Sequence, residues 1–88
     1  MITVYKTDGT QVELPKAPTL KEAQAIVGGY VERVCPRKSP GIVMLVDEEG
    51  LLKHYPPNLK GTLLYGDPIV GDVIVMDRES AKPWLDGN

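Results

Sequence analysis

The stretch EAQAIVGGYVERV, residues 22–34, changes its apolar period at a pair of glycines. Before the pair, apolar side chains recur every three or four positions from Leu20 to Val27, which is the period of an amphipathic helix. Thr19, with Glu22 three positions later, has the capping-box pattern of a helix start. After the pair, the side chains alternate and are rich in β-branched and aromatic types, as in a strand.

The glycine pair predicts where this helix ends. Glycine readily adopts the left-handed conformation that closes a helix, so we expect a short helix over about residues 19–28 that ends at Gly28 and Gly29. Residues 30–34 then form a strand, and a helix that continues through the glycines is the alternative. On the expected strand, one face carries Tyr30, Glu32 and Val34, and the other carries Val31, Arg33 and Cys35.

Two hairpins are expected on either side of this region. Residues 2–5 and 11–14 flank an Asp-Gly turn, and so predict an N-terminal β-hairpin. The apolar run IVMLVD, residues 42–47, predicts a strand that is buried on both faces. A left-handed Gly50 after it and the segment LLKHY, residues 51–55, predict a central hairpin that returns antiparallel.

The remaining sequence predicts one helical turn and a last strand. Asn58 is placed to cap a helical turn over about residues 58–64. The run IVGDVIVMD then predicts a C-terminal strand, in which Gly71 marks a bulge or a close approach of other atoms to the backbone. The fold class is therefore α+β, a small and mainly antiparallel sheet with one short helix. We expect a single domain over residues 1–80 and a C-terminal tail over residues 81–88.

Composition excludes several classes of protein. The chain has 88 residues, no Phe, one Cys and a net charge of −2. A core this thin favours support from self-association, so we expect a homo-oligomer. The weak negative charge disfavours nucleic-acid binding. The sequence has neither a signal-peptide pattern nor an apolar run of about 18 residues, which predicts a protein of the cytoplasm that does not enter the membrane.

Catalytic and metal-binding patterns are equally sparse. His54 lies on an expected strand without a paired nucleophile or carboxylate, and Cys35 is expected to be a small buried hydrophobe. The consecutive acidic residues 47–49 lack the alternating spacing of a calcium loop, and we interpret them as a solvated turn. No glycine pattern matches a P-loop or a dinucleotide fingerprint. We therefore predict no enzyme, no metal and no cofactor.

Four stretches carry a resemblance to a known family, namely AQAIVGGYVERV, VMLVDEEGLLKHYPPN, LKGTLLYG and IVGDVIVM. In order and spacing they resemble a domain-of-unknown-function family of small proteins encoded by phages and other mobile elements. The chain departs from the family pattern at Gly61, where relatives commonly have Ala, and Trp84 lies in a tail outside the resemblance. The resemblance implies a phage or mobile-element accessory protein in the host cytoplasm, and assigns no catalytic residue.

Five side chains are candidates for binding because an apolar core does not need them: Tyr30, Glu32, Arg33, Asn58 and Asp72. Each follows a glycine or proline feature that fixes its direction, and fixed groups lose less entropy on binding. The structural interpretation is that Tyr30 packs at the edge of the core and that Asp72 accepts a turn N–H.

These residues support three function classes. The first is a non-enzymatic protein that binds a host or phage protein, for example to modulate or counter host defence. The alternative is a small-ligand binder that sequesters a nucleotide signal, in which Tyr30 stacks on a base and the amides of Gly28, Gly29 and Gly71 hold phosphate. A small enzyme is the third class.

Overall fold

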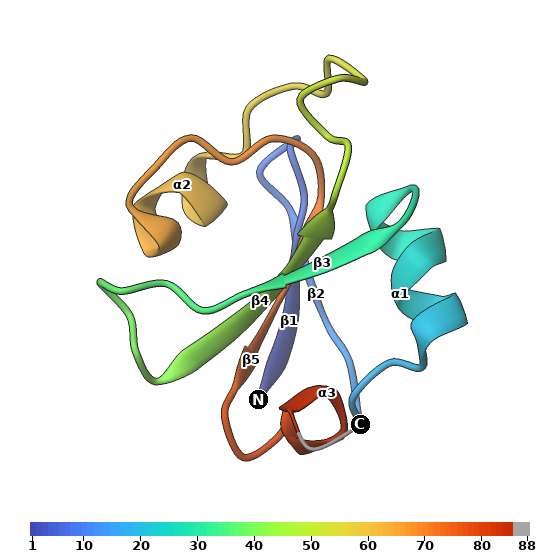
Figure 1. Ribbon diagram of the computed structural model, residues 1–88, viewed down its shortest axis with the longest axis vertical. Helices are drawn as coiled ribbons and strands as arrows, with labels where there is room; N and C mark the ends of the chain where they lie inside the picture. Colours follow the sequence, from blue (N-terminus) through green and yellow to red (C-terminus); the bar gives the residue numbers. More distant parts are fainter. Residues whose placement is uncertain (86–88) are drawn as a thin grey trace.

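The computed structural model describes residues 1–85 and shows one open antiparallel sheet of five strands with three short helices (Figure 1). The elements are β1 (Ile2–Tyr5), β2 (Gln11–Glu13), α1 (Leu20–Val27), β3 (Val31–Val34), β4 (Ile42–Asp47), α2 (Leu59–Tyr65), β5 (Val73–Asp77) and α3 (Lys82–Leu85). The strand order is β2-β1-β5-β4-β3, and every neighbouring pair is antiparallel. This arrangement confirms the predicted α+β class.

The helix α1 begins and ends where its sequence predicts. The hydroxyl of Thr19 accepts from the Glu22 amide at 3.1 Å, and the Glu22 carboxylate accepts from the Thr19 amide at 2.8 Å. Gly28 closes the helix in the left-handed conformation with a φ of 97°, and its N–H donates to the carbonyl of Gln24. Only glycine adopts this conformation without a steric penalty, so the helix stops there.

The segment after the glycines is a strand, and the continuous-helix alternative is wrong. The Tyr30 carbonyl accepts from the Glu48 amide at 2.8 Å, and the ladder between β3 and β4 then runs from Val31 opposite Asp47 to Val34 opposite Met44. The central hairpin therefore consists of β3 and β4.

The predicted return strand over residues 51–55 is not present. Residues 48–54 form consecutive turns instead, and Gly50 does not have a positive φ. The physical reason is that β4 already has β3 on one side and β5 on the other, so no backbone edge remains for a further strand. The one residue other than glycine with a positive φ in the described chain is His54, at 57°.

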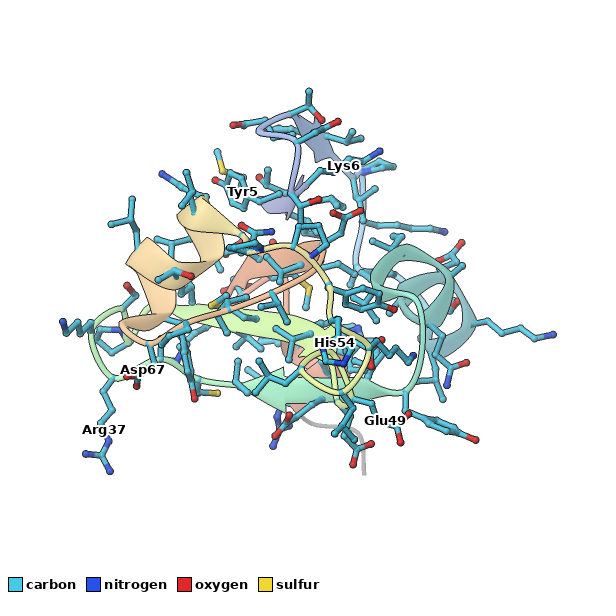
Figure 2. The ribbon with its side chains drawn as sticks, turned by 90° about the horizontal axis from the view of Figure 1, so that it is seen from above. Tyr5, Lys6, Arg37, Glu49, His54 and Asp67 are labelled. Carbon is cyan, nitrogen blue, oxygen red and sulfur yellow. The ribbon has the colours of Figure 1, made fainter. Side chains whose placement is uncertain are left out.

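The sheet is covered on both faces, which confirms the prediction for the apolar run of β4. Val43 and Leu45 of β4 pack beneath α1, while Met44 and Val46 face α2. Figure 2 shows the sheet between these two helices. The α1 side holds a buried cluster of nine residues: Ile2, Val4, Ala23, Val27, Val43, Leu45, Ile74, Met76 and Ala81. The α2 side holds a smaller one: Met44, Val46, Ile69, Val73 and Val75.

The second helix and the chain end are both anchored. Asn58 caps α2 as predicted, because its side-chain oxygen accepts from the Gly61 amide at 2.8 Å. Gly61 is buried, and an added Cβ would lie 3.0 Å from Ile69, so glycine here allows α2 to pack closely. In α3, Trp84 Nε1 donates to the Pro18 carbonyl at 3.0 Å and so docks the tail on the α1 side. Residues 86–88 of the predicted tail lie outside the described residues.

Candidate functional site

Among the described residues 1–85, the strand β3 forms one edge of the sheet. The carbonyl of Tyr30 bonds the Glu48 amide of the neighbouring chain segment, which fixes the phase of the ladder. Because hydrogen bonds in an antiparallel ladder alternate, every second residue from Tyr30 bonds inward to β4. The peptide groups of Val31 and Arg33 therefore point away from β4, toward the open side of the sheet.

The side chains of β3 alternate between the two faces as predicted. Val31 packs against the buried cluster on the α1 side, and Arg33 Nη1 donates to the Trp84 carbonyl at 2.6 Å on the same side. Glu32 and Val34 lie on the α2 side, where they line a shallow groove. The edge strand thus presents an acidic residue on one face and a basic residue on the other.

We call this groove the β3 groove. It has a volume of about 170 Å³ and lies between β3, the end of α2 and the turn that follows β4. Its lining is mainly apolar and comprises Glu32, Val34, Val46, Leu51, Tyr65, Pro68, Ile69 and Val70. Leu51 is 73% exposed and so offers apolar surface at the side of the groove. The β3 groove runs along the same strand whose peptide groups face outward.

A buried carboxylate holds the turn that carries Leu51. Asp47 Oδ2 accepts from Lys53 Nζ at 2.9 Å and from the Tyr55 hydroxyl at 2.9 Å, and its Oδ1 accepts from the Glu49 amide at 2.8 Å. Lys53 also donates to the Gly28 carbonyl at 3.1 Å, at the C-terminal end of α1, where a cation is favoured by the helix dipole. We call Asp47, Lys53 and Tyr55 the Asp47 cluster; it ties the turn to α1.

The hydrogen bonds of the Asp47 cluster shift three pKa values. Burial alone would raise the pKa of Asp47, but hydrogen bonds from Lys53, the Glu49 amide and Tyr55 outweigh burial and hold that pKa below its ordinary value. The same contact with Asp47 raises the pKa of Lys53 and of Tyr55. At neutral pH the cluster therefore contains one anion, one cation and a neutral phenol.

The Asp47 cluster corrects one prediction. Asp47 is buried and paired with Lys53, and it is not part of a solvated acidic turn. The sequence contains a signal that would have found this: Asp47 follows Val43 and Leu45 at the same period of two, so its carboxylate continues the inward-facing side of β4. A carboxylate at an inward position needs a partner.

Two of the three predicted glycines meet at a second hollow, whereas Gly29 lines a different one beside Tyr30 and Lys53. Gly28 and Gly71 line the second hollow together with Thr7, Tyr55 and Asp72. Gly71 has a φ of 80°, and an added Cβ would lie 2.6 Å from the Tyr55 ring, which confirms the predicted close approach to the backbone. The amide of Gly71 donates to the Pro56 carbonyl and that of Gly28 to the Gln24 carbonyl. Both amides are therefore engaged within the protein.

Two of the predicted binding side chains anchor the backbone. Asn58 is 1% exposed, and its amide group donates to the Tyr5 carbonyl at 2.9 Å and the Gly71 carbonyl at 2.8 Å. Asp72 accepts from the Thr7 amide at 2.9 Å, as its structural interpretation predicts. These contacts join α2, β1 and β5 at one end of the sheet.

The five candidate binding side chains thus lie in three separate parts of the structure. Tyr30, Glu32 and Arg33 lie together on the β3 edge, and Tyr30 is 67% exposed, so it does not pack at the edge of the core. Asp72 lies at the hollow that Gly28 and Gly71 line, and Asn58 is buried. Leu51 was missed as a contributor to the β3 groove, because the turn that carries it was expected to be a strand.

A comparison with known families gives one match. A family model described as "Domain of unknown function (DUF3846)" matches residues 2–83. The chain belongs to this family. No curated protein and no solved structure matches it.

Metal-binding and nucleophilic side chains are dispersed in this DUF3846 chain. Over residues 1–85, no group of three or more His, Cys, Asp or Glu side chains is arranged to hold a metal ion. His54 lies in a turn and not on a strand, and it is exposed (Figure 2). Cys35 is exposed as well, so its predicted burial is wrong.

The helices of this DUF3846 chain are short. None within residues 1–85 is both long enough and apolar enough to cross a membrane.

Proposed function

We propose that this protein is a non-enzymatic binding protein that takes up an extended segment of a partner protein along β3. The observation that carries the proposal is the open edge of β3, where the peptide groups of Val31 and Arg33 point outward. An added strand would pair with these groups, as in the known mode of recognition in which a peptide extends a sheet. Main-chain hydrogen bonds supply affinity in this mode, and side-chain hollows supply specificity.

The β3 groove supports the same proposal. Alternate side chains of an added strand fall on the α2 side, directly above the groove that Glu32 and Val34 line. Leu51 and Tyr65 offer apolar surface there to a partner side chain. The Asp47 cluster supports this surface because it holds the turn of Leu51 in place, and a pre-organised surface loses less entropy on binding.

The opposite edge of the sheet offers a weaker site. β2 has only three paired residues and ends shortly before Pro15, which has no N–H for a ladder. The β3 edge combines a longer strand with an adjoining groove. This contrast favours β3 over β2 as the binding edge.

The nucleotide-binding alternative has less support. Two of its three expected phosphate donors, the amides of Gly28 and Gly71, already donate to protein carbonyls. Their hollow also contains the Asp72 carboxylate and the C-terminal end of α1, both of which repel phosphate. These contacts favour the binding of a protein segment over the binding of a nucleotide.

The biological setting belongs to the proposal as well. The resemblance to small phage and mobile-element proteins favours an accessory protein whose partner is a host or phage protein, and modulation of host defence is the role that we propose. Self-association stays a prediction, and light scattering of the purified chain at micromolar concentration tests it.

Peptide selection followed by residue-resolved amide exchange tests the proposed function. A random dodecapeptide library displayed on a carrier is selected against the full chain, and the enriched peptides are synthesised. In the free protein the amides of Val31 and Arg33 should exchange fast, whereas the inward amide of Glu32 is protected. A bound peptide should protect the two outward amides and leave the exchange of Glu32 nearly unchanged.

Proline variants at matched edge positions provide the control. Arg33→Pro removes an outward N–H and should weaken peptide binding by about tenfold or more, which corresponds to roughly one lost hydrogen bond. Arg33→Ala keeps the backbone N–H and should weaken peptide binding less than Arg33→Pro does. Glu13→Pro makes the same change on β2, where the peptide groups of Glu13 also point away from the sheet. This variant should leave peptide binding unchanged. Failure to select any peptide, or equal losses for Arg33→Pro and Glu13→Pro, would overturn the proposal.

A further inference from the structure

The two charged side chains of β3 specify what kind of strand fits beside it. We propose that the bound segment runs antiparallel to β3 and reads apolar–acidic–basic–apolar, with its basic residue opposite Glu32 and its acidic residue opposite Arg33. We further propose that this segment comes from a different protein and not from a second copy of this chain. The inference rests on the proposed function and names the partner class for the same edge.

Position 32 is the stronger determinant of the two. Its peptide groups bond inward to β4, so a residue opposite it on the outer side forms a non-hydrogen-bonded pair. The side chains of such a pair approach more closely than those of a hydrogen-bonded pair. An exposed carboxylate at this position therefore favours a Lys or Arg across the strand and disfavours an Asp or Glu.

Position 33 adds a second requirement on the other face. Its peptide groups point outward, so the opposing residue forms a hydrogen-bonded pair with a wider spacing. The guanidinium already donates to the Trp84 carbonyl, which holds it beside the strand and leaves its other N–H groups to meet a carboxylate. The acidic residue is therefore a secondary determinant.

The two flanking positions require apolar residues. Val34 lines the β3 groove beside Leu51 and Tyr65, so the residue opposite it enters apolar surface. Val31 is half-buried at the edge of the α1-side core, and an apolar residue opposite it extends that core. Together with the charged pairs, these positions define the four-residue pattern.

A second copy does not satisfy this pattern. A two-fold dimer through β3 pairs the strand antiparallel with itself, and opposing side chains must lie on the same face. The two central registers then place Glu32 opposite its own copy, or Arg33 opposite its own copy. Like charges directly opposite each other are destabilising, so the charges that attract a foreign strand also repel a second β3.

Charge reversal with the same peptide library tests the inference. The library is selected separately against the full-length wild-type chain and the Glu32→Lys variant, with Glu13→Lys on β2 as the matched control. Wild type and Glu13→Lys should enrich Lys or Arg at the third position of the pattern, whereas Glu32→Lys should enrich Asp or Glu there. A wild-type peptide and its charge-reversed form should exchange their order of affinity between wild type and Glu32→Lys, by about threefold to tenfold. Thermal melts of each variant check that these exposed substitutions leave the fold intact.

The experiments distinguish a failure of this inference from a failure of the proposed function. Peptides that lose affinity with Arg33→Pro, yet show the same sequence preference for wild type and Glu32→Lys, would leave the proposed function standing and overturn this inference. Protection of the Val31 and Arg33 amides that rises with protein concentration alone would show self-pairing at β3 and would overturn it too. Peptides that bind without sensitivity to Arg33→Pro would refute the proposed function itself.

Discussion

The carboxylate of Asp47 lies 2.9 Å from the ammonium group of Lys53, and the Asp47 side chain is 1% exposed whereas that of Lys53 is 33% exposed. The pair thus joins the end of β4 to a turn that has no strand partner of its own. This contact, with the Tyr55 hydroxyl on the same oxygen, gives the turn after β4 its fixed position.

Removal of the buried carboxylate should destabilise the fold. Asp47→Ala removes the buried carboxylate that accepts from Lys53, the Tyr55 hydroxyl and the Glu49 amide, and we expect the free energy of unfolding to fall by about 2 kcal/mol. Glu48→Ala, at the exposed neighbouring position, should change it by less than about 0.5 kcal/mol. Urea titrations followed by circular dichroism measure both. Equal midpoints for the two variants would show that the cluster contributes nothing to stability.

Stability should depend on pH through the same cluster. The pKa of Asp47 is lowered in the folded state, so its contribution is present above the ordinary pKa of 3.8 and is lost as pH falls through the folded value. The pKa values of Lys53 and Tyr55 are raised, so their contributions are present at neutral pH and are lost as pH rises through the folded values. Thermal melts over a pH series measure the effect. Asp47→Asn should flatten the acidic part of the curve, and an unchanged acidic slope would contradict the assignment.

The glycine at position 71 should tolerate no side chain. Gly71→Ala introduces a Cβ at a φ of 80° and 2.6 Å from the Tyr55 ring, and strain of this kind costs about 1–3 kcal/mol. Gly41→Ala is the matched control, because its Cβ would have nothing within 4 Å. Differential scanning calorimetry should show a clearly lower melting temperature for Gly71→Ala alone. Comparable temperatures would mean that Tyr55 moves aside without cost.

Tyr30 and Asn58 should separate binding from folding. Asn58→Ala removes three hydrogen bonds of a buried side chain, so we expect a loss of about 2–4 kcal/mol in the free energy of unfolding. Tyr30→Ala changes an exposed side chain at the β3 edge and should lower stability by less than about 0.5 kcal/mol while weakening peptide binding. Chemical denaturation and peptide titration of both variants check this. A Tyr30→Ala protein with unchanged affinity would place Tyr30 outside the binding surface.

Local sequence determined the parts of the fold whose causes lie within a few residues. Thr19, Glu22 and Gly28 start and stop α1 through contacts three and four positions apart, and the alternation after the glycines specifies β3. The buried run of β4 and the cap of α2 at Asn58 are equally local. These features follow from backbone conformation and apolar period, which are properties of short segments.

Only the tertiary structure decided which strands pair with each other in the sheet. The segment after Gly50 has an apolar content that suits a strand, yet β3 and β5 take both sides of β4, so the segment turns and its Leu51 is left beside the β3 groove. The same topology makes β3 an edge and brings Lys53 to Asp47. Strand pairing joins residues that are distant in the chain. The sequence pattern of one segment therefore contains no information about which strands pair with its two edges.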